Sequence, residues 1–248
     1  MKMNKLSRNT IKYIAMLTML IDHIGVMVTN TTLNIIMRYI IGRIAFLLFL
    51  FLFIDGFLRT KHYIRHLVDL LLFAIISEPF YDKYNYNKWL EFDDQNIMFT
   101  LFLNFMLLIV LKKLLDSKMD LLTKISLILV SITAVSFLCY WCNFNYGIIG
   151  IVSCGIGYLL YQKFQNKLIT ISFISLCFCV EWLFGYLFDK HTIMSAWQII
   201  GWILPIFIVY FYDKDKPCKY SKIRKYSFYA FYPLHLSILL LFKEIFLW

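Results

Sequence analysis

The sequence contains few charged residues and few residues that interrupt helices. Asp, Glu, Lys and Arg make up 16% of the 248 residues, and there are only four prolines and nine glycines. A soluble domain is about 25% charged and 45–50% apolar, whereas 61% of this chain, about 151 residues, is hydrophobic. These proportions exclude a secreted enzyme, a cytosolic globular enzyme and a disordered protein, because a soluble fold of this length cannot bury so much apolar surface. The remaining class is a polytopic integral membrane protein.

The sequence also lacks a linker and the common cofactor motifs. No stretch rich in Gly, Ser or Pro divides it, so we expect one domain over residues 1–248. Phosphate-binding glycine loops, H-E-x-x-H and G-x-S-x-G are absent, which argues against the usual nucleotide, zinc and serine-hydrolase sites. Cys139 and Cys142 have metal-ligand spacing but no second pair accompanies them, so we expect no metal. An outer-face disulfide and a redox pair remain open for these two cysteines.

The apolar residues form long continuous runs. A transmembrane barrel would alternate apolar and polar residues, so these runs predict membrane-spanning helices, which satisfy their own backbone groups in lipid. Nine helices are predicted, near residues 11–29, 36–58, 65–80, 97–112, 121–139, 145–162, 168–187, 196–212 and 226–247. The fold class is therefore an all-α polytopic membrane protein, with short third and fourth spans.

The net charge of +10 comes from 25 basic and 15 acidic residues. The basic residues occur at the N-terminus and in every second loop, whereas the loop at 81–96 is acidic. This pattern follows the positive-inside rule. It predicts a cytoplasmic N-terminus and an outer C-terminus, and it argues against nucleic acid as a partner.

A small set of charged or titratable residues lies within the predicted spans, where each charge costs roughly 3 kcal/mol. The set is Asp22, His23, Arg43, Asp55, Asp69, Glu78, Glu181 and His235. At 1.5 Å per residue, the two histidines, Glu78, Glu181, Asp22 and Arg43 fall at similar depth. We therefore expect one buried polar cavity, with a set of structural ion pairs as the alternative.

Lys12 and His23 are separated by eleven residues, or three helical turns, so they share one helix face about 16 Å apart. This arrangement suits a long donor whose anionic head lies at the cytoplasmic rim and whose reactive end lies in the membrane. Asp22 points about 100° away from His23 and is expected to pair with Arg43 instead.

Tyr232 and His235 are separated by three residues and face one way. Pro233 between them loosens the last predicted helix and frees a backbone carbonyl. A core histidine in a kinked helix is the equally weighted alternative.

Five ordered motifs extend along almost the whole chain: Ile11–Gly25, Gly42–Phe46 leading into Phe51–Thr60, Phe73–Phe80, Asn96–Leu101 and Tyr232–Leu236. Together they resemble the TraX family, named for the conjugative-pilus protein that acetylates the N-terminus of F-pilin. TraX-like proteins in turn resemble the acyltransferase-3 group, in which a basic residue eleven positions before a first-helix His is a signature that Lys12 and His23 match.

The sequence also departs from that wider group. Asp55 replaces the Ser of its Ser-Gly-Phe motif, and the group has ten or more spans. Its paired-arginine motif has no clear counterpart, with Arg38 and Arg43, or Arg59 and Arg65, as alternatives.

The resemblance implies an acetyl-CoA-dependent acetyltransferase of the bacterial cytoplasmic membrane. The expected cofactor-binding residues at the cytoplasmic mouth are Lys12, Asp55, Arg59, Arg65 and Arg224. His23 would be a general base or a transient acyl carrier. Glu78, Asp22 or Tyr232 would orient it, and Arg43 or His235 would stabilise the developing oxyanion.

The expected acceptor is an amine or hydroxyl of a pilin-like peptide or another cell-envelope molecule, and a homodimer is compatible with these features. Two alternatives use the same buried charges. One is a transporter, flippase or proton relay. The other is a non-catalytic partner of a pilus or secretion apparatus.

Overall fold

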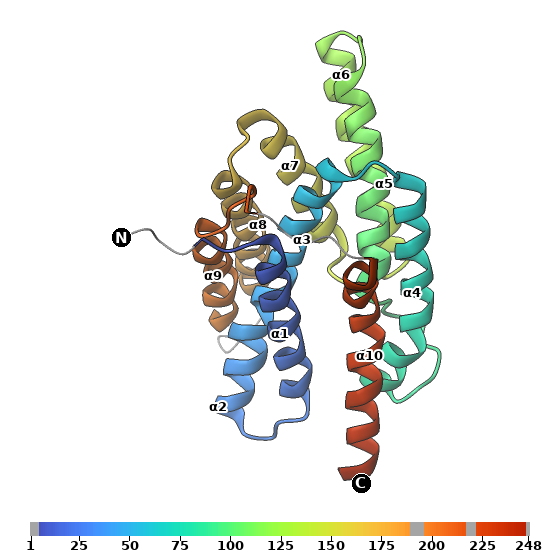
Figure 1. Ribbon diagram of the computed structural model, residues 1–248, viewed down its shortest axis with the longest axis vertical. Helices are drawn as coiled ribbons and strands as arrows, with labels where there is room; N and C mark the ends of the chain where they lie inside the picture. Colours follow the sequence, from blue (N-terminus) through green and yellow to red (C-terminus); the bar gives the residue numbers. More distant parts are fainter. Residues whose placement is uncertain (1–4, 189–195, 217–221, 247–248) are drawn as a thin grey trace.

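The computed structural model describes residues 5–188, 196–216 and 222–246 (Figure 1). The helices are α1 (Arg8–Val26), α2 (Thr31–Asn34), the π-helix η1 (Ile35–Ile41), α3 (Gly42–Arg59), α4 (Tyr63–Tyr86), α5 (Ile97–Asp116), α6 (Leu121–Trp141), α7 (Gly147–Phe164), α8 (Lys167–Leu187), α9 (Gln198–Tyr210) and α10 (Lys222–Phe246). Because α2, η1 and α3 form one continuous rod, the described residues contain nine helical rods. The predicted all-helical fold is confirmed.

Six helices are long and apolar enough to cross a membrane. They are the rod Thr31–Arg59, α5, α6, α7, α8 and the Tyr226–Ile245 part of α10. Each exceeds or approaches the roughly 20 residues that a bilayer crossing requires. The chain is a multi-pass membrane protein, whereas nine crossings and the orientation of the termini stay predictions.

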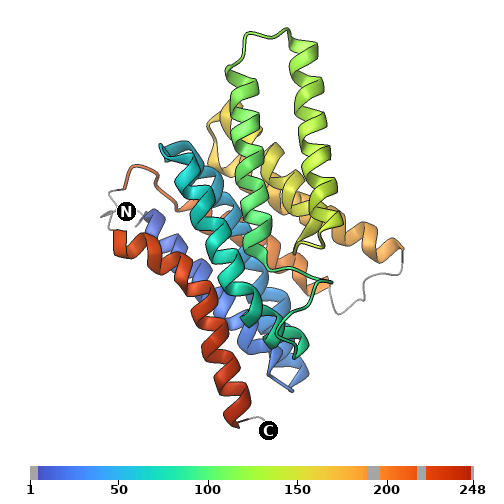
Figure 2. The same cartoon turned by 90° about the vertical axis from the view of Figure 1, so that its right-hand side faces the viewer.

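The α3 helix is the centre of the bundle. It packs against α1, α7, α8 and α9, and 67% of the most apolar window in its rod is buried. In contrast, only 11% of the corresponding window of α6 is buried. A helix that is apolar all round belongs either in a protein core or against lipid. Figure 2 shows α5 and α6 as a hairpin that projects beyond the rest of the bundle, which places α6 among the lipid-facing helices.

Short polar residues begin several helices. The Ser7 hydroxyl accepts from the Thr10 N–H at 3.2 Å, and the Asp120 carboxylate accepts from the Thr123 N–H at 2.9 Å. Asn96 caps α5 in the same way, accepting from the Met98 N–H at 2.8 Å. These contacts satisfy backbone donors that a helix leaves free at its first turn.

The predicted third span at 65–80 was too short. The α4 helix continues for 24 residues, through Pro79 and past Glu78 and Asp82. The predicted span ended before Asp82, whereas the helix continues and the protein encloses the carboxylates of both Glu78 and Asp82. The α5 helix is also longer than predicted, at 20 residues.

Candidate functional site

Two histidines far apart in the sequence meet between α1 and α10. The Nδ1 atom of His23 lies 3.1 Å from the Nε2 atom of His235, and the ring centroids are 4.8 Å apart. His23 is in the last turn of α1, about 22 Å from the start of the helix at 1.5 Å per residue. His235 is 3% exposed, and the His23 ring is only partly covered.

The hydrogen-bond partners assign the tautomers of both rings. The Nδ1 atom of His235 faces the Phe231 carbonyl oxygen at 2.8 Å, so it carries a proton and its neutral Nε2 is an acceptor. The Nδ1 atom of His23 faces the Met19 carbonyl at 3.0 Å as well as this Nε2, so it also carries a proton. The Nε2 lone pair of His23 therefore remains available to accept a proton from a reacting group.

The predicted shared face of Lys12 and His23 is confirmed by their common neighbour. The Lys12 ammonium lies 4.4 Å from the ring centroid of Phe228, and His23 contacts His235. Both of these partners are on α10, so the face of α1 that carries the ammonium and the imidazole is turned toward α10. Met19, seven residues after Lys12 and four before His23, lies on the same face by helical spacing.

Two charged residues, Asp22 and Arg43, lie beside His23 at the junction of η1 and α3. Asp22 packs against Gly42 so closely that a Cβ there would lie 2.3 Å from its Oδ1. Arg43 is within electrostatic range of Asp22 and of His23, and its Nε donates to the Arg38 carbonyl at 3.1 Å. Among the described residues, no ion pair within 4 Å joins Asp22 to Arg43. The two charges therefore interact at longer range and not through the direct contact that the sequence predicted.

Tyr146 supports this charged group from the opposite side. It adopts a left-handed conformation with φ of 60°, which a bulky residue rarely occupies. Its ring stacks on Phe46 with 3.7 Å between the ring centroids, and its hydroxyl is within electrostatic range of Arg43. Strain of this kind costs about 1–3 kcal/mol and concentrates at functional sites.

Glu78 and Tyr232 do not orient His23. The Glu78 Oε2 accepts from the backbone N–H of Asn96 at 3.2 Å and from the Asn96 side-chain amide, which fixes the start of α5. Tyr232 lies beside His235, with ring centroids 5.5 Å apart, and near Glu78. The groups that hold His23 are instead the Met19 carbonyl and His235.

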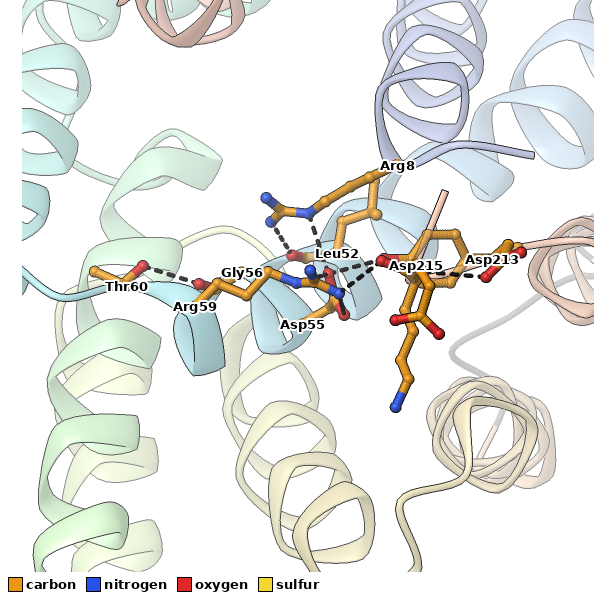
Figure 3. Close-up of polar contacts among 10 residues, drawn as sticks. Arg8, Leu52, Asp55, Gly56, Arg59, Thr60, Asp213 and Asp215 are labelled. Carbon is orange, nitrogen blue, oxygen red and sulfur yellow. Dashed lines mark hydrogen bonds and ion pairs between the residues drawn. The ribbon is translucent and has the colours of Figure 1, made fainter. Parts of the chain in front are cut away.

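Asp55 is enclosed by a network at the far end of α3 rather than open to a ligand (Figure 3). Its Oδ2 lies 3.1 Å from Arg8 Nε and 3.3 Å from Arg59 Nε, and accepts from the Tyr212 hydroxyl at 3.0 Å. Arg59 also donates to the Lys214 carbonyl at 3.2 Å. These contacts join the start of α1 and the segment after α9 to α3.

A backbone bridge reinforces the same junction. The Leu6 N–H donates to the Phe211 carbonyl at 2.7 Å, and the Asp213 N–H donates to the Leu6 carbonyl at 3.0 Å. The pKa of Asp213 is lowered because its carboxylate accepts from the Asp215 N–H and pairs with Lys5 at 3.2 Å.

The cationic residues predicted to bind the donor lie in two separate places, the Asp55 network and the first half of α10. Arg59 belongs to the Asp55 network, whereas Arg65 on α4 donates to the Tyr226 hydroxyl of α10 at 3.0 Å. Lys12 also contacts α10, through Phe228. Lys12 and Arg65 thus contact the first half of α10 from two sides, and the Arg224 side chain lies outside the described residues.

One other sequence-based expectation was wrong: Glu181 is exposed on α8 and does not join the polar group around His23.

The structure has no disulfide between Cys139 and Cys142, which are both free thiols. The Cys139 thiol is buried and donates to the Gly147 carbonyl at 3.5 Å.

Two further residues belong to these sites although their side chains carry no periodic signal in the sequence. Tyr84 on α4 donates its hydroxyl proton to the His23 carbonyl oxygen at 2.5 Å, and its ring lies edge-on to the His23 ring at 5.8 Å. Arg8 was counted among the positive-inside charges, yet it lies against Gly56 and pairs with Asp55.

Comparison with known proteins extends the sequence resemblance. The family model described as TraX protein matches residues 7–243. The chain belongs to the TraX family. A curated relative is 24% identical over 249 residues, covering 92% of each chain, and is named "Probable fimbrial assembly protein FimC, serogroup H1" from Dichelobacter nodosus. No solved structure matches this chain significantly.

Proposed function

We propose that this TraX family protein is an integral-membrane acetyltransferase in which His23 is the general base. The observation that carries the proposal is the hydrogen bond between the histidine rings, which leaves the His23 Nε2 lone pair free. A general base needs such a lone pair within reach of the proton that it removes. The match of the family model supports the same reading.

The donor in this proposal is acetyl-CoA that enters from the cytoplasmic side. Its phosphates would bind Lys12 and Arg65, the two predicted cations that flank the first half of α10. The thioester would then lie along the α1 face that leads to His23. Arg59 would contribute less than predicted, because Asp55 already engages its guanidinium.

The reaction needs no redox partner. The Nε2 atom of His23 removes a proton from the acceptor amine or hydroxyl, whose nitrogen or oxygen forms a bond to the acetyl carbon. The carbon–sulfur bond then breaks, and the imidazolium returns the proton to the CoA thiolate. The positive charge of Arg43 near His23 would stabilise the oxyanion that forms between these steps.

His235 has a distinct role in this scheme. Its Nε2 accepts a hydrogen bond from the Nδ1–H of His23, and this bond strengthens as His23 becomes positive. It therefore acts as a positioning residue rather than as an oxyanion donor. A transient acetyl group on His23 would use the same free Nε2.

The test is acetyl transfer by the purified full chain in nanodiscs. Replacing His23 with Ala is expected to lower CoA release from acetyl-CoA by about 10²–10⁴-fold, the usual contribution of a general base. His62→Ala is the matched control, because that histidine is exposed at the start of α4. Full activity of the His23 variant would remove the proposal.

A non-catalytic role in fimbrial assembly is the second candidate, favoured by the name of the curated relative. In that case cells carrying His23→Ala would assemble normal fimbriae and show no loss of acetylated envelope peptides by mass spectrometry. Loss of the acetyl mark at normal protein abundance would favour the transferase.

A further inference from the structure

A cavity of about 310 Å³ lies between the C-terminal ends of α4 and α10. Its lining residues are Lys83 and Asn87 from α4 and its cap, and Leu240, Lys243 and Glu244 from α10. Figure 1 shows α10 running beside α4 and continuing to the C-terminus. The cavity is at the end of the bundle opposite the Asp55 network, where the sequence predicts the outer face of the membrane.

The cavity carries charges of both signs that are not paired with one another. Among the described residues, neither Lys83 nor Lys243 has a carboxylate within 4 Å. The Lys83 ammonium donates to the Asn87 side-chain oxygen at 2.8 Å. The Lys243 ammonium donates to the Tyr84 carbonyl at 3.4 Å. Because an ammonium group has three donors, the cavity offers two cations with donors to spare beside the exposed carboxylate of Glu244.

Lys83 continues an apolar face of α4, the helix that contains the third predicted span. Ile76 and Leu72 precede it by seven and eleven residues, so both lie within about 20° of Lys83 around the helix axis. Each is 51% exposed, as expected of side chains that contact lipid. They lie roughly 10 Å and 16 Å from Lys83 along the helix. A ligand that binds this lysine can therefore extend against apolar side chains.

Aromatic residues indicate the depth of the cavity in the membrane. The Lys83 ammonium lies 5.7 Å from the centroid of the Trp89 ring, and Trp89 is exposed. Trp is enriched at the boundary between the acyl chains and water. On α10, the exposed Ile245 follows Glu244 directly. The charged lining thus lies where phospholipid headgroups are found, with the apolar face of α4 beneath it.

We propose that this cavity binds the headgroup of an ethanolamine phospholipid of the adjacent leaflet. The phosphodiester, with one negative charge, accepts charge-assisted hydrogen bonds from Lys83 and Lys243. The ethanolamine ammonium, two carbons away, donates to Glu244. One acyl chain packs along Ile76 and Leu72. The inference is independent of the transferase function, because none of these residues belongs to the histidine site.

The mixed charge of the lining favours this headgroup over others. A glycolipid without phosphate offers no anion to the two lysines, and a glycerol headgroup offers no cation to Glu244. Inorganic phosphate would match the lysines, but it would leave Leu240 and the exposed face of α4 without an apolar partner.

The experiment measures which lipid the full chain retains. The purified protein is incubated with an equimolar mixture of phosphatidylethanolamine, phosphatidylglycerol and monoglucosyldiacylglycerol with the same acyl chains, and the complexes are counted by native mass spectrometry. The ethanolamine lipid is expected to exceed the glucosyl lipid about five- to tenfold, as for two exposed ion pairs. It should exceed the glycerol lipid about two- to threefold, as for one pair.

Two variants test the two halves of the headgroup separately. Lys83→Gln combined with Lys243→Gln should abolish the preference over the glucosyl lipid. Glu244→Gln should abolish only the preference over the glycerol lipid. Lys88→Gln is the matched control and should preserve both preferences, because Lys88 is exposed outside the cavity and is paired with Glu91.

Four results would overturn the assignment. They are equal retention of the ethanolamine and glucosyl lipids by the wild-type chain, equal or stronger retention of the glycerol lipid, an unchanged preference in the double lysine variant, and displacement of the bound lipid by millimolar inorganic phosphate. The last result would assign the cavity to free phosphate. The His23→Ala variant should show the wild-type preferences, so failure of the catalytic proposal and failure of the lipid site are distinguishable.

Discussion

Replacing His235 with Phe isolates the contribution of the bond between the two rings. The His235 ring is 3% exposed and stacks on Phe231 with 4.8 Å between centroids and 11° between planes. Phe preserves the ring volume and this stacking. It removes the Nε2 acceptor that faces His23 at 3.1 Å, and also the Nδ1 donor to the Phe231 carbonyl at 2.8 Å. The second loss lies within α10 and should lower the unfolding temperature, whereas the loss of the first bond should lower activity per folded molecule.

The magnitude follows from how the hydrogen bond changes during the reaction. A hydrogen bond between neutral groups contributes about 0.5–1.5 kcal/mol, and one to a charged group contributes about 1.5–3 kcal/mol. Only the increase, about 1–1.5 kcal/mol, is specific to the state in which His23 is positive. His23 retains the Met19 carbonyl at 3.0 Å, so the loss is not larger. The expected effect is a decrease in kcat of roughly tenfold, with KM nearly unchanged.

The assay is CoA release by the purified variants at saturating acetyl-CoA, together with thermal unfolding as a control for folding. His235→Gln is the rescue variant, because its Oε1 atom offers an acceptor in place of the imidazole Nε2. It should recover part of the loss. Activity of His235→Phe within twofold of wild type would refute the positioning role, and a loss as severe as that of His23→Ala would make His235 the base.

Four further outcomes follow from other parts of the structure. Asp55→Asn should lower the free energy of unfolding by about 3 kcal/mol, because it leaves Arg8 without its ion partner. Thermal denaturation measures this loss. Activity per folded molecule should stay unchanged, and a selective loss of donor binding would contradict the structural role of Asp55. Gly201→Ala should destabilise the protein by about 1–3 kcal/mol, because its Cβ would lie 2.4 Å from a backbone oxygen of η1. Gly155→Ala is the control, since its Cβ would contact only side-chain atoms, at 3.2 Å or more. Equal unfolding temperatures for the two variants would be inconsistent with this packing. Because the pKa of Asp213 is lowered in the folded protein, its contribution should be complete above pH about 4 and be lost as the pH falls below that value, seen as faster exchange of the Asp213 amide proton, with no change in Asp213→Asn. Reductant should not change the gel mobility or unfolding temperature, since the five described cysteines are free; a reductant-sensitive band would show a bridge.

The sequence predicts the helices well because lipid imposes length and apolarity on each of them. It also predicts that His23 and His235 lie at similar depth, since depth follows from the rise per residue. The meeting of the two rings at 3.1 Å confirms that expectation. What depth cannot supply is the rotation of each helix about its own axis.

The incorrect assignments arise because the rotation of each helix about its axis could not be predicted. A helix that is apolar all round carries no moment to indicate which side faces the protein. Glu181 therefore appeared to share the polar cavity, although α8 turns it outward. Glu78 was correctly expected to be buried, but its partner is the cap of α5 rather than His23. Arg8 could not be distinguished from an ordinary cytoplasmic anchor, because its pairing with Asp55 depends on tertiary packing.

The π-helix η1 makes the spacing between Arg38 and Arg43 sensitive to chain length. Each backbone bond in a π-helix spans one residue more than in an α-helix, so this segment contains surplus length within an otherwise regular rod. Deleting one residue from Ile35–Ile41 would convert it to a regular helix and leave the flanking turns close to their present phase, because the wider π turns accommodate one extra residue. A relative shortened by one residue here would keep both ends of the rod in register, so alignments of homologous chains should tolerate a one-residue gap inside this segment better than elsewhere in the rod.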